Sequence, residues 1–365
     1  MSYKGDYLTT AMMIIKKYDL KNKTMKAAIF YGPGKVRLDE IDVPTIKSDE
    51  VLVKIKTALT CGTDRKMYLR GHHLFVPPFV FGHEFAGEII MVGEEVKSFY
   101  PGMKVAAANS APCNHCFYCK KGKFNLCENL YLHLSGAFAE YIKIPGVIVS
   151  QNLFSFPKTV NYKEAALLEP LACVVHGIEE SKINLGDTVV INGAGPIGLL
   201  YLQIVQLKGA RVIITDKREE RLELASKLGA YKTINISTIG NPVEEVKKYT
   251  EGERGADVVI EAVGLPEVWE QAILMVRKGG VINLFGGCES GAKISIDTNL
   301  IHYSQVNIKG IFHHTPQYVK RAYNLICNKV INVDSLITHQ LSLNEISTVI
   351  EMMLKYKGIK IAIIP

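Results

Sequence analysis

Four of the eight cysteines in this chain are crowded into a stretch of 15 residues. They follow the pattern Cys113-x-x-Cys116-x-x-Cys119-x7-Cys127. Four thiolates form a closed tetrahedral shell, which suits zinc and leaves no open position for a substrate. Iron–sulfur proteins also contain such runs, but there proline follows the last cysteine, whereas here Glu128 does. The spacing therefore predicts a structural zinc site, with four free thiols as the alternative.

A glycine turn is the second chemical signal. The segment GAGPIG at 193–198 follows a run of Val and Ile and precedes apolar residues with a helical period. The first glycine permits a tight turn, the second lets the backbone approach a pyrophosphate, and the third allows close packing of helix on strand. The helix N-terminus then offers N–H donors to phosphates. A purely structural turn is the alternative, but this strand-turn-helix context is the one that binds a dinucleotide.

An acidic residue follows at the distance that a dinucleotide site requires. Asp216 ends the next apolar strand, 18 residues after the last glycine. A carboxylate there accepts hydrogen bonds from ribose hydroxyls and repels a 2′-phosphate, which favours NAD over NADP. Lys217 and Arg218 come next and would soften that repulsion if they face the ribose, but a charged pair at the start of an exposed helix is more often solvated. We expect the cofactor contacts to come from Gly193, Gly195, Pro196, Ile197, Gly198, Asp216 and Arg221.

Four further residues carry metal-binding side chains without a diagnostic spacing. They are Cys61, His83, Glu84 and Glu169. Taken singly, a cysteine after a strand is usually a core residue, and a lone histidine is usually a hydrogen-bonded polar residue. A glutamate before proline is often a helix cap or a surface charge. Spacing alone does not decide between these roles and a metal site.

Two patterns of secondary structure surround these motifs. From residue 25 to about residue 148, short strands and turns predict an antiparallel, barrel-like β domain. From Gly186 onward, strands and helices alternate, which predicts a doubly wound parallel sheet. We expect its strands at 188–192, 211–215, 231–236, 256–262, 280–285 and 306–311. Two helices near 317–328 and 343–355 and a strand at 360–364 cannot fold alone, so we expect them to return to the first domain.

Composition excludes several classes of protein. The chain of 365 residues is long enough for two cores, and 48% of it is hydrophobic. The net charge of +7 is spread along the chain, so nucleic acid is not an expected partner. No window has the roughly 18 consecutive apolar residues of a membrane span. We expect a soluble cytoplasmic protein with an N-terminal extension, 1–24, of unassigned role.

Together these motifs resemble the zinc-dependent medium-chain dehydrogenases, the group of alcohol, sorbitol and threonine dehydrogenases. The resemblance extends from residue 25 to the C-terminus and implies an α/β and β fold. A GroES-like β-barrel catalytic domain would comprise 25–177 and 313–365, and a Rossmann NAD-binding domain would comprise 178–312. The similarity is carried by the cysteine tetrad, the glycine turn, TCGTD at 60–64, FGHEF at 81–85, GEIIMVG at 87–93 and LEPL at 168–171.

The resemblance implies a role for each dispersed residue. Cys61 and His83 match ligands of the family's catalytic zinc. Glu84 matches a carboxylate that binds the metal in some members and lies beside it in others, and Glu169 matches an acid near the metal in the sorbitol and threonine branches. The implied cofactors are two zinc ions per subunit, one catalytic and one structural, and NAD.

The implied chemistry is oxidation of an alcohol. Zinc lowers the pKa of the substrate hydroxyl, and hydride passes from the carbinol carbon to nicotinamide. Thr63 matches the hydroxyl that relays the proton towards the cofactor ribose, with a turn-capping hydroxyl as the alternative. Many relatives have histidine five residues after the zinc cysteine. Here that residue is Lys66, which we interpret as a surface charge rather than a proton shuttle. His72, His73, His313 and His314 stay unassigned.

We therefore expect an NAD-dependent zinc enzyme that oxidises the secondary hydroxyl of a polyol or sugar-derived alcohol. An L-threonine-type amino-alcohol dehydrogenase is the alternative within this class. A non-catalytic NAD-binding protein is the alternative from another class. The expected partner is a small-molecule alcohol, with no nucleic acid and no membrane, and the resemblance implies a homo-oligomer, either a dimer or a tetramer.

Overall fold

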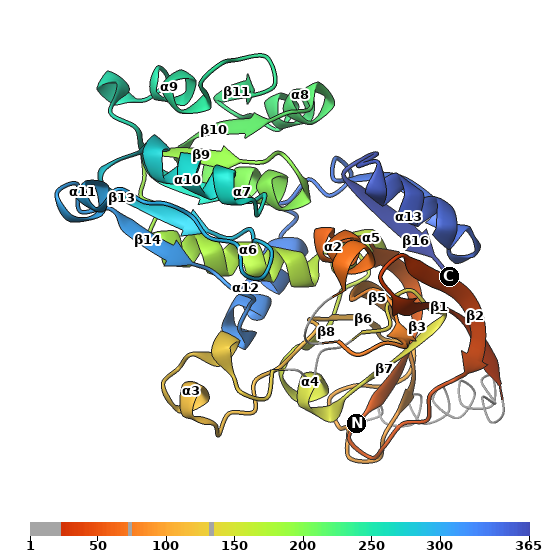
Figure 1. The fold of residues 1–365 in the computed structure, drawn as a ribbon. Helices are drawn as coiled ribbons and strands as arrows, with labels where there is room; N and C mark the ends of the chain where they lie inside the picture. Colours follow the sequence, from red (N-terminus) through yellow and green to blue (C-terminus); the bar gives the residue numbers. More distant parts are fainter. Residues whose placement is uncertain (1–22, 72–74, 131–134) are drawn as a thin grey trace. The chain divides into compact units, whose positions relative to one another are not determined.

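A computed structural model describes residues 23–71, 75–130 and 135–365 of the protein (Figure 1). The chain divides into two compact units. The discontinuous unit combines residues up to 172 with 315–365, and the inserted unit comprises 173–314. The first limit falls within helix α6 (Leu168–Ser181). The domain limits expected from the sequence, near 177 and 313, stay predictions.

The inserted unit is built on one six-stranded parallel sheet (Figure 1). Its order, β11-β10-β9-β12-β13-β14, is the 3-2-1-4-5-6 order of dinucleotide-binding folds. The strands are β9 (Thr188–Asn192), β10 (Arg211–Asp216), β11 (Lys232–Asn235), β12 (Ala256–Glu261), β13 (Val276–Leu284) and β14 (Asn307–Gly310). The helices between them are α7 (Pro196–Leu207), α8 (Glu219–Lys227), α9 (Pro242–Lys247), η2 (Glu251–Glu253), α10 (Pro266–Met275) and α11 (Thr298–His302).

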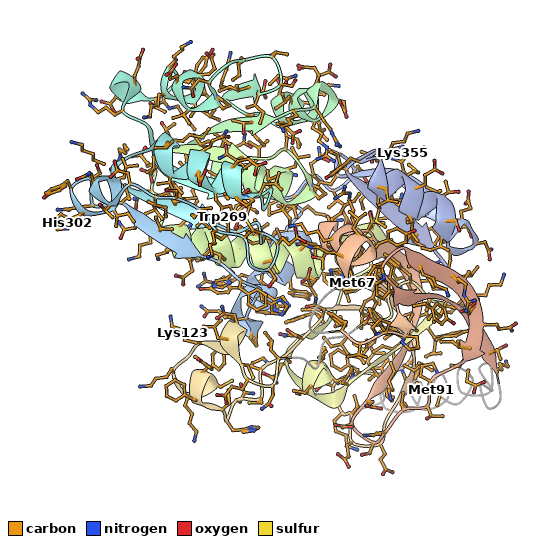
Figure 2. The ribbon with its side chains drawn as sticks, in the orientation of Figure 1. Met67, Met91, Lys123, Trp269, His302 and Lys355 are labelled. Carbon is orange, nitrogen blue, oxygen red and sulfur yellow. The ribbon has the colours of Figure 1, made fainter. Side chains whose placement is uncertain are left out.

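Apolar strands explain why this sheet is central to its unit. All residues of β9 are buried, as expected of a parallel strand covered on both faces. Val190 and Val259 lie in a core that includes Ala272 of α10. Trp269 packs against that core, and its indole N–H donates to the carbonyl of Gly286 at 2.9 Å (Figure 2).

The discontinuous unit contains two largely antiparallel sheets. The smaller has the order β2-β1-β4, and the larger has the order β15-β16-β3-β5-β6-β8, with β7 also paired to β3. Only β15 and β16 pair in parallel among the described strands of this unit. The strands are β1 (Thr24–Gly32), β2 (Lys35–Asp42), β3 (Val51–Leu59), β4 (Phe79–Val80), β5 (Glu84–Val92), β6 (Lys104–Ala107), β7 (Tyr141–Ile144), β8 (Leu153–Ser155), β15 (Ile337–Ser342) and β16 (Lys360–Ile364).

Short helices connect or follow these strands. They are α2 (Gly62–Arg70), α3 (Phe117–Lys120), η1 (Phe124–Leu126), α4 (Gly146–Gln151), α5 (Tyr162–Ala166), α12 (Pro316–Cys327), η3 (Leu343–Glu345) and α13 (Ile346–Leu354). The C-terminal helix α13 places Val349 and Met353 in the same core as Val53 of β3. The last elements of the chain therefore return to the first sheet, as the sequence predicts.

Strand register brings three distant segments together in the larger sheet. Leu59, the last residue of β3, pairs with Glu84 at the start of β5, and β16 pairs with the same end of β3. Cys61 follows β3 by two residues, and His83 immediately precedes β5. Lys360 opens β16. The sheet thus fixes the backbones of Cys61, His83 and Lys360 at the same end of the adjacent strands β3, β5 and β16.

Some elements differ in extent from those expected. β13 begins at Val276, four residues early, because Val276 pairs with Ala256 ahead of an irregularity in the register. The expected helix 343–355 is η3 followed by α13. Thr24 already belongs to β1, whereas residues 1–22, His72 and His73 lie outside the described residues. Within the described part of the chain, every helix is too short or too polar to cross a bilayer.

Candidate metal and nucleotide sites

Cys61 is held at the start of helix α2. Its backbone is extended (φ −124°, ψ 154°), and its N–H donates to Asp64 Oδ2 at 2.8 Å. A carboxylate in the first turn satisfies an otherwise unpaired N–H and interacts favourably with the helix dipole. On the opposite side, Met67 is buried in the core of this unit (Figure 2). The helix is therefore fixed at both its capping residue and its apolar face.

His83 is positioned by the glycine that precedes it. Gly82 has φ +80°, and a Cβ there would lie 2.4 Å from Phe138 Cδ1, so the position requires glycine. His83 Nδ1 lies 3.2 Å from Asp64 Oδ1. Burial lowers the pKa of His83, but the negative charges of Asp64 and Cys61 outweigh burial and raise that pKa well above its usual value. One buried carboxylate thus supports two of the predicted ligands.

Glu84 is paired with a lysine from the end of the chain. Lys360 is fully buried, and its Nζ donates to Glu84 Oε2 and to the carbonyl of Thr60, the latter at 2.9 Å. Thr60 Oγ1 accepts a hydrogen bond from the Ile361 N–H at 3.0 Å, which ties β16 to the end of β3. Glu84 Oε1 is buried and has no hydrogen-bond partner among the described residues.

The pKa values of Glu84 and Lys360 are both raised, with opposite consequences for the charge of the pair. Burial raises the pKa of Glu84 to about 7, against the charges of Lys360 and His83, which lower it. Burial lowers the pKa of Lys360, but the charges of Glu84, Cys61 and Glu169 outweigh burial and raise it. The first shift favours a neutral carboxyl, and the second requires a charged one. We assign a charged pair because the ammonium has two oxygen acceptors and no other means of satisfying its donors among the described contacts.

These side chains match the donor set of a zinc site. The Cys61 sulfur, a His83 ring nitrogen and a Glu84 carboxylate oxygen all lie within 4.8 Å of one another. Thiolate, imidazole and carboxylate are zinc ligands, and three protein ligands with an open fourth position are typical of catalytic sites. Glu84 Oε1, a buried acceptor without a partner among the described residues, is the kind of atom that a cation would satisfy.

The remaining predicted residues of this site lie in the same unit. Glu169 is buried in the first turn of α6, and its charge raises the pKa of Glu84. It does not belong to the set formed by Cys61, His83 and Glu84. Thr63 is exposed in the first turn of α2, and Lys66, one turn later, is half-buried.

The four clustered cysteines form a second donor set. Their sulfurs lie within 4.8 Å of one another, and those of Cys116 and Cys127 are 3.9 Å apart. A tetrahedral shell with zinc–sulfur bonds of about 2.3 Å puts sulfurs about 3.8 Å apart. All four cysteines are free of disulfides. The backbone N–H groups of Cys113 and Asn129 both donate to Cys127 Sγ at 3.3 Å, so the loop is folded around that sulfur.

Hydrogen bonding and burial shift the pKa values of these thiols in different directions. The backbone N–H of His115 contributes most to lowering the pKa of Cys113 to about 5, whereas burial raises the pKa of Cys119 to about 12. Four adjacent thiolates repel one another unless a cation is present, and metal binding requires all four to be deprotonated. The donor set therefore fits a metal better than it fits four independent thiols.

The glycine turn of the inserted unit has the three expected properties. Gly193 has φ +103°, and a Cβ on Gly198 would lie 1.8 Å from the Gly193 carbonyl oxygen. These two positions require glycine for the turn and for helix packing. At Gly195, in contrast, a Cβ would meet only Arg221 Nη1, at 3.5 Å. The space beside Gly195, at the N-terminus of α7, is therefore open to a phosphate group.

Asp216 joins this turn to the end of β10. Its Oδ2 accepts a hydrogen bond from the Ala194 N–H at 2.8 Å, and its Oδ1 accepts one from the Arg218 N–H at 3.0 Å. Each carboxylate oxygen has a second acceptor site, which remains for a ribose hydroxyl. The structure thus brings Gly195, Asp216 and Arg221 together around one turn. Pro196 and Ile197 form the first turn of α7.

Of the histidines without a predicted role, His313 and His314 lie at the end of the inserted unit, near His176. His176 Nδ1 donates to the carbonyl of His313 at 2.7 Å, and the rings of His313 and His314 are 4.0 Å apart. His313 has φ +63°, in the left-handed region.

Two residues beside the predicted metal ligands have no role predicted from the sequence. Asp64 lies within the TCGTD motif but had no assigned role, although an acid in the first turn of a helix is a recognisable capping signal. Lys360 is the first residue of an apolar strand and is 276 residues away from Glu84 in the sequence. A lysine at the start of such a strand is the one sequence signal for its role.

Comparison with known proteins agrees with the geometry. The family described as "Alcohol dehydrogenase GroES-like domain" matches residues 47–153, and the family described as "Zinc-binding dehydrogenase" matches residues 196–328. A sorbitol dehydrogenase from Bacillus subtilis is 33% identical over 353 residues, covering 94% of this chain and 98% of that protein. An L-threonine 3-dehydrogenase from the same organism is 35% identical over 336 residues, covering 90% and 94%.

A solved structure extends the similarity to three dimensions. A putative zinc-binding dehydrogenase from Sinorhizobium meliloti 1021, bound to NADP, superimposes with a TM-score of 0.86 at 32% identity. The match covers 94% of this chain and 100% of that one. With the two family matches and relatives similar over nearly their whole length, the chain belongs to the zinc-dependent medium-chain dehydrogenases.

Proposed function

We propose that this protein oxidises the secondary hydroxyl of a polyol or sugar-derived alcohol, with NAD as the hydride acceptor and zinc at the Cys61–His83–Glu84 set. Its membership of the family makes it an oxidoreductase acting on CH–OH groups with zinc and a nicotinamide cofactor. The observation that supports the catalytic assignment best is the convergence of a thiol, an imidazole and a buried, half-satisfied carboxylate within 4.8 Å.

The two cofactors would supply the bond-making chemistry. Bound zinc acts as a Lewis acid towards the substrate hydroxyl, and nicotinamide accepts the hydride. Cys61, His83 and Glu84 would hold the metal, with Glu169 close by. Thr63 Oγ1, two residues after Cys61, would take the hydroxyl proton and pass it on. Lys66 lies one turn further along α2 and needs no role in that transfer.

The preference for NAD rests on Asp216. Its carboxylate is fixed by the Ala194 and Arg218 N–H groups at the end of β10, so a 2′-phosphate would meet a fixed negative charge. Lys217 and Arg218 next to it would reduce this repulsion. A relative holding NADP is known in this family, so the two cofactors must be compared directly.

A structural metal and self-association complete the proposal. The tetrad would hold a second zinc ion with no part in the chemistry, because four protein ligands leave no open position. We expect a homo-oligomer, and β14, at the edge of the six-stranded sheet, offers an unpaired edge among the described strands. Light scattering on the purified protein would measure the number of subunits.

The similarity to threonine dehydrogenases makes an amino-alcohol the second candidate substrate. The experiment is NADH formation by zinc-loaded protein across polyols, sugars, simple secondary alcohols and L-threonine, with NADP in parallel. Turnover of polyols with NAD supports the proposal, and a preference for threonine supports the second candidate. Absence of turnover by folded, zinc-loaded protein would contradict both and leave a non-catalytic NAD-binding role.

A further inference from the structure

The two oxygens of the Glu84 carboxylate have different environments. Oε2 accepts a hydrogen bond from Lys360 Nζ, whereas Oε1 is buried and lacks a hydrogen-bond partner among the described residues. The residue is 1% exposed, so solvent does not satisfy the second oxygen. Leaving a buried, charged oxygen without a hydrogen bond is unfavourable for the free energy of folding. Oε1 is therefore a buried acceptor to which no described residue offers a donor, and a bound cation would satisfy it.

Lys360 is placed to maintain this asymmetry. It is 1% exposed on β16, and its ammonium is oriented by a second acceptor, the Thr60 carbonyl at 2.9 Å. Thr60 immediately precedes Cys61, and it is bound to Ile361 through both its backbone and its side chain. The lysine therefore bonds to the residue that precedes Cys61 as well as to Glu84. If it moved away from Glu84, its ammonium group would lose one of these two acceptors.

The charge balance of the site also depends on this lysine. Glu84 and Glu169 are both buried carboxylates of this unit, and Lys360 Nζ donates to Glu84 Oε2. A buried group of like charges is unfavourable unless cations offset it. Without Lys360, the carboxylate of Glu84 would lack a fixed position and a counter-charge.

We propose that Lys360 is a positioning residue of the metal centre: by holding Glu84 Oε2 it leaves Oε1 directed to the metal as a single-oxygen ligand. This inference depends on the proposed metal site at Cys61 and His83. It also distinguishes the two glutamates, because Glu84 becomes the carboxylate ligand and Glu169 a neighbouring charge. Replacing a residue that orients a metal ligand typically lowers metal affinity by about 10–100-fold.

The test uses full-length protein loaded with Co²⁺ in place of zinc. The visible absorption that is lost in Cys61→Ser reports the proposed site, and competition with a chelator reports its affinity. We expect Lys360→Met to change that absorption and to lower Co²⁺ affinity by about tenfold or more. Lys309→Met is the matched control, because Lys309 Nζ likewise contacts one carbonyl and one carboxylate, both of Glu180, at 2.8 and 3.4 Å in the inserted unit.

A double variant shows whether Lys360 acts through Glu84. If it does, Lys360→Met combined with Glu84→Gln should match Glu84→Gln alone in absorption and affinity, because the lysine then has no ligand to position. The double variant also removes both charges, so it avoids the uncompensated buried carboxylate that would destabilise Lys360→Met. If Lys360→Met is too unstable to isolate, this comparison alone decides.

Two results would overturn the inference. One is Lys360→Met with the absorption and affinity of wild type and of Lys309→Met. The other is a double variant whose Co²⁺ affinity falls below that of Glu84→Gln by the same factor by which Lys360→Met falls below wild type. Failure of the proposed function looks different: Cys61→Ser would then bind as much Co²⁺ as wild type, and both proposals would fall.

Discussion

Asp64 Oδ1 lies 3.2 Å from His83 Nδ1, so a buried carboxylate contacts the ring of a predicted metal ligand. The second oxygen of the same carboxylate accepts the backbone N–H of Cys61 at 2.8 Å. A carboxylate that orients a metal-binding histidine also fixes its tautomer. Asp64 therefore couples the positions of two ligands that come from different loops.

Replacing Asp64 should weaken the metal site without unfolding the protein. Asp64→Asn keeps the shape of the side chain but removes its charge, so we expect metal affinity to fall by about 10–100-fold. Chelator competition on the zinc-loaded protein measures this. Asp297→Asn is the control, because Asp297 also accepts a backbone N–H at a helix start, but in the inserted unit. Equal affinities for the two variants would contradict the role of Asp64.

Metal binding at Cys61 and His83 should depend on pH. The charges of Asp64 and Cys61 outweigh burial and raise the pKa of His83 in the metal-free protein, and only neutral imidazole binds a metal. Below that raised pKa a proton on His83 competes with the metal, so affinity should fall by at least about tenfold for each pH unit. Titration with Co²⁺ at a series of pH values measures the slope. A flat profile through and below neutral pH would show that His83 is not a ligand.

The cysteine tetrad should govern stability rather than turnover chemistry. Structural zinc contributes directly to folding free energy, so Cys116→Ser should lower the thermal midpoint. A loss of 2 kcal/mol corresponds to about 4–8 °C for units of this size. Cys327→Ser, which lies outside the tetrad, is the control. An unchanged midpoint in Cys116→Ser, measured by calorimetry of the zinc-loaded protein, would argue against a metal at the tetrad.

Two glycines of the nucleotide turn should respond differently to alanine. Gly195→Ala adds a methyl group with space around it in the protein, so folding should be intact while NAD affinity falls at least about tenfold, because the methyl occupies the phosphate position. Gly198→Ala places the methyl 1.8 Å from a carbonyl oxygen and should destabilise the unit by about 1–3 kcal/mol. Calorimetric NAD titration and thermal unfolding separate the two effects. Unaltered NAD affinity in Gly195→Ala would place the pyrophosphate elsewhere.

The parallel sheet was predictable because its signals are local. The strand β9 is a run of buried Val and Ile residues, and the glycine turn after it has a fixed chemical pattern. The expected strands therefore agree with the observed ones to within a few residues. The early start of β13 was missed because it depends on pairing with Ala256, which the residues at 276–280 do not encode by themselves.

The metal site was only partly predictable because its contacts are distant in sequence. Cys61 and His83 were identified by resemblance, since neither has a local spacing that distinguishes a ligand from a core residue. Lys360 approaches Glu84 only because β16 pairs beside β3, and strand order is a property of the whole sheet. The tetrad is the opposite case, because all its ligands lie in one short loop.

The measurement that tests the account most directly is NADH formation and NAD binding by Cys61→Ser beside wild type, both loaded with zinc. We predict that the variant loses turnover of every alcohol that the wild type oxidises, while its NAD affinity stays largely intact, because Cys61 belongs to the discontinuous unit and the glycine turn to the inserted one. Turnover retained by Cys61→Ser would contradict the assignment of a catalytic metal at this residue.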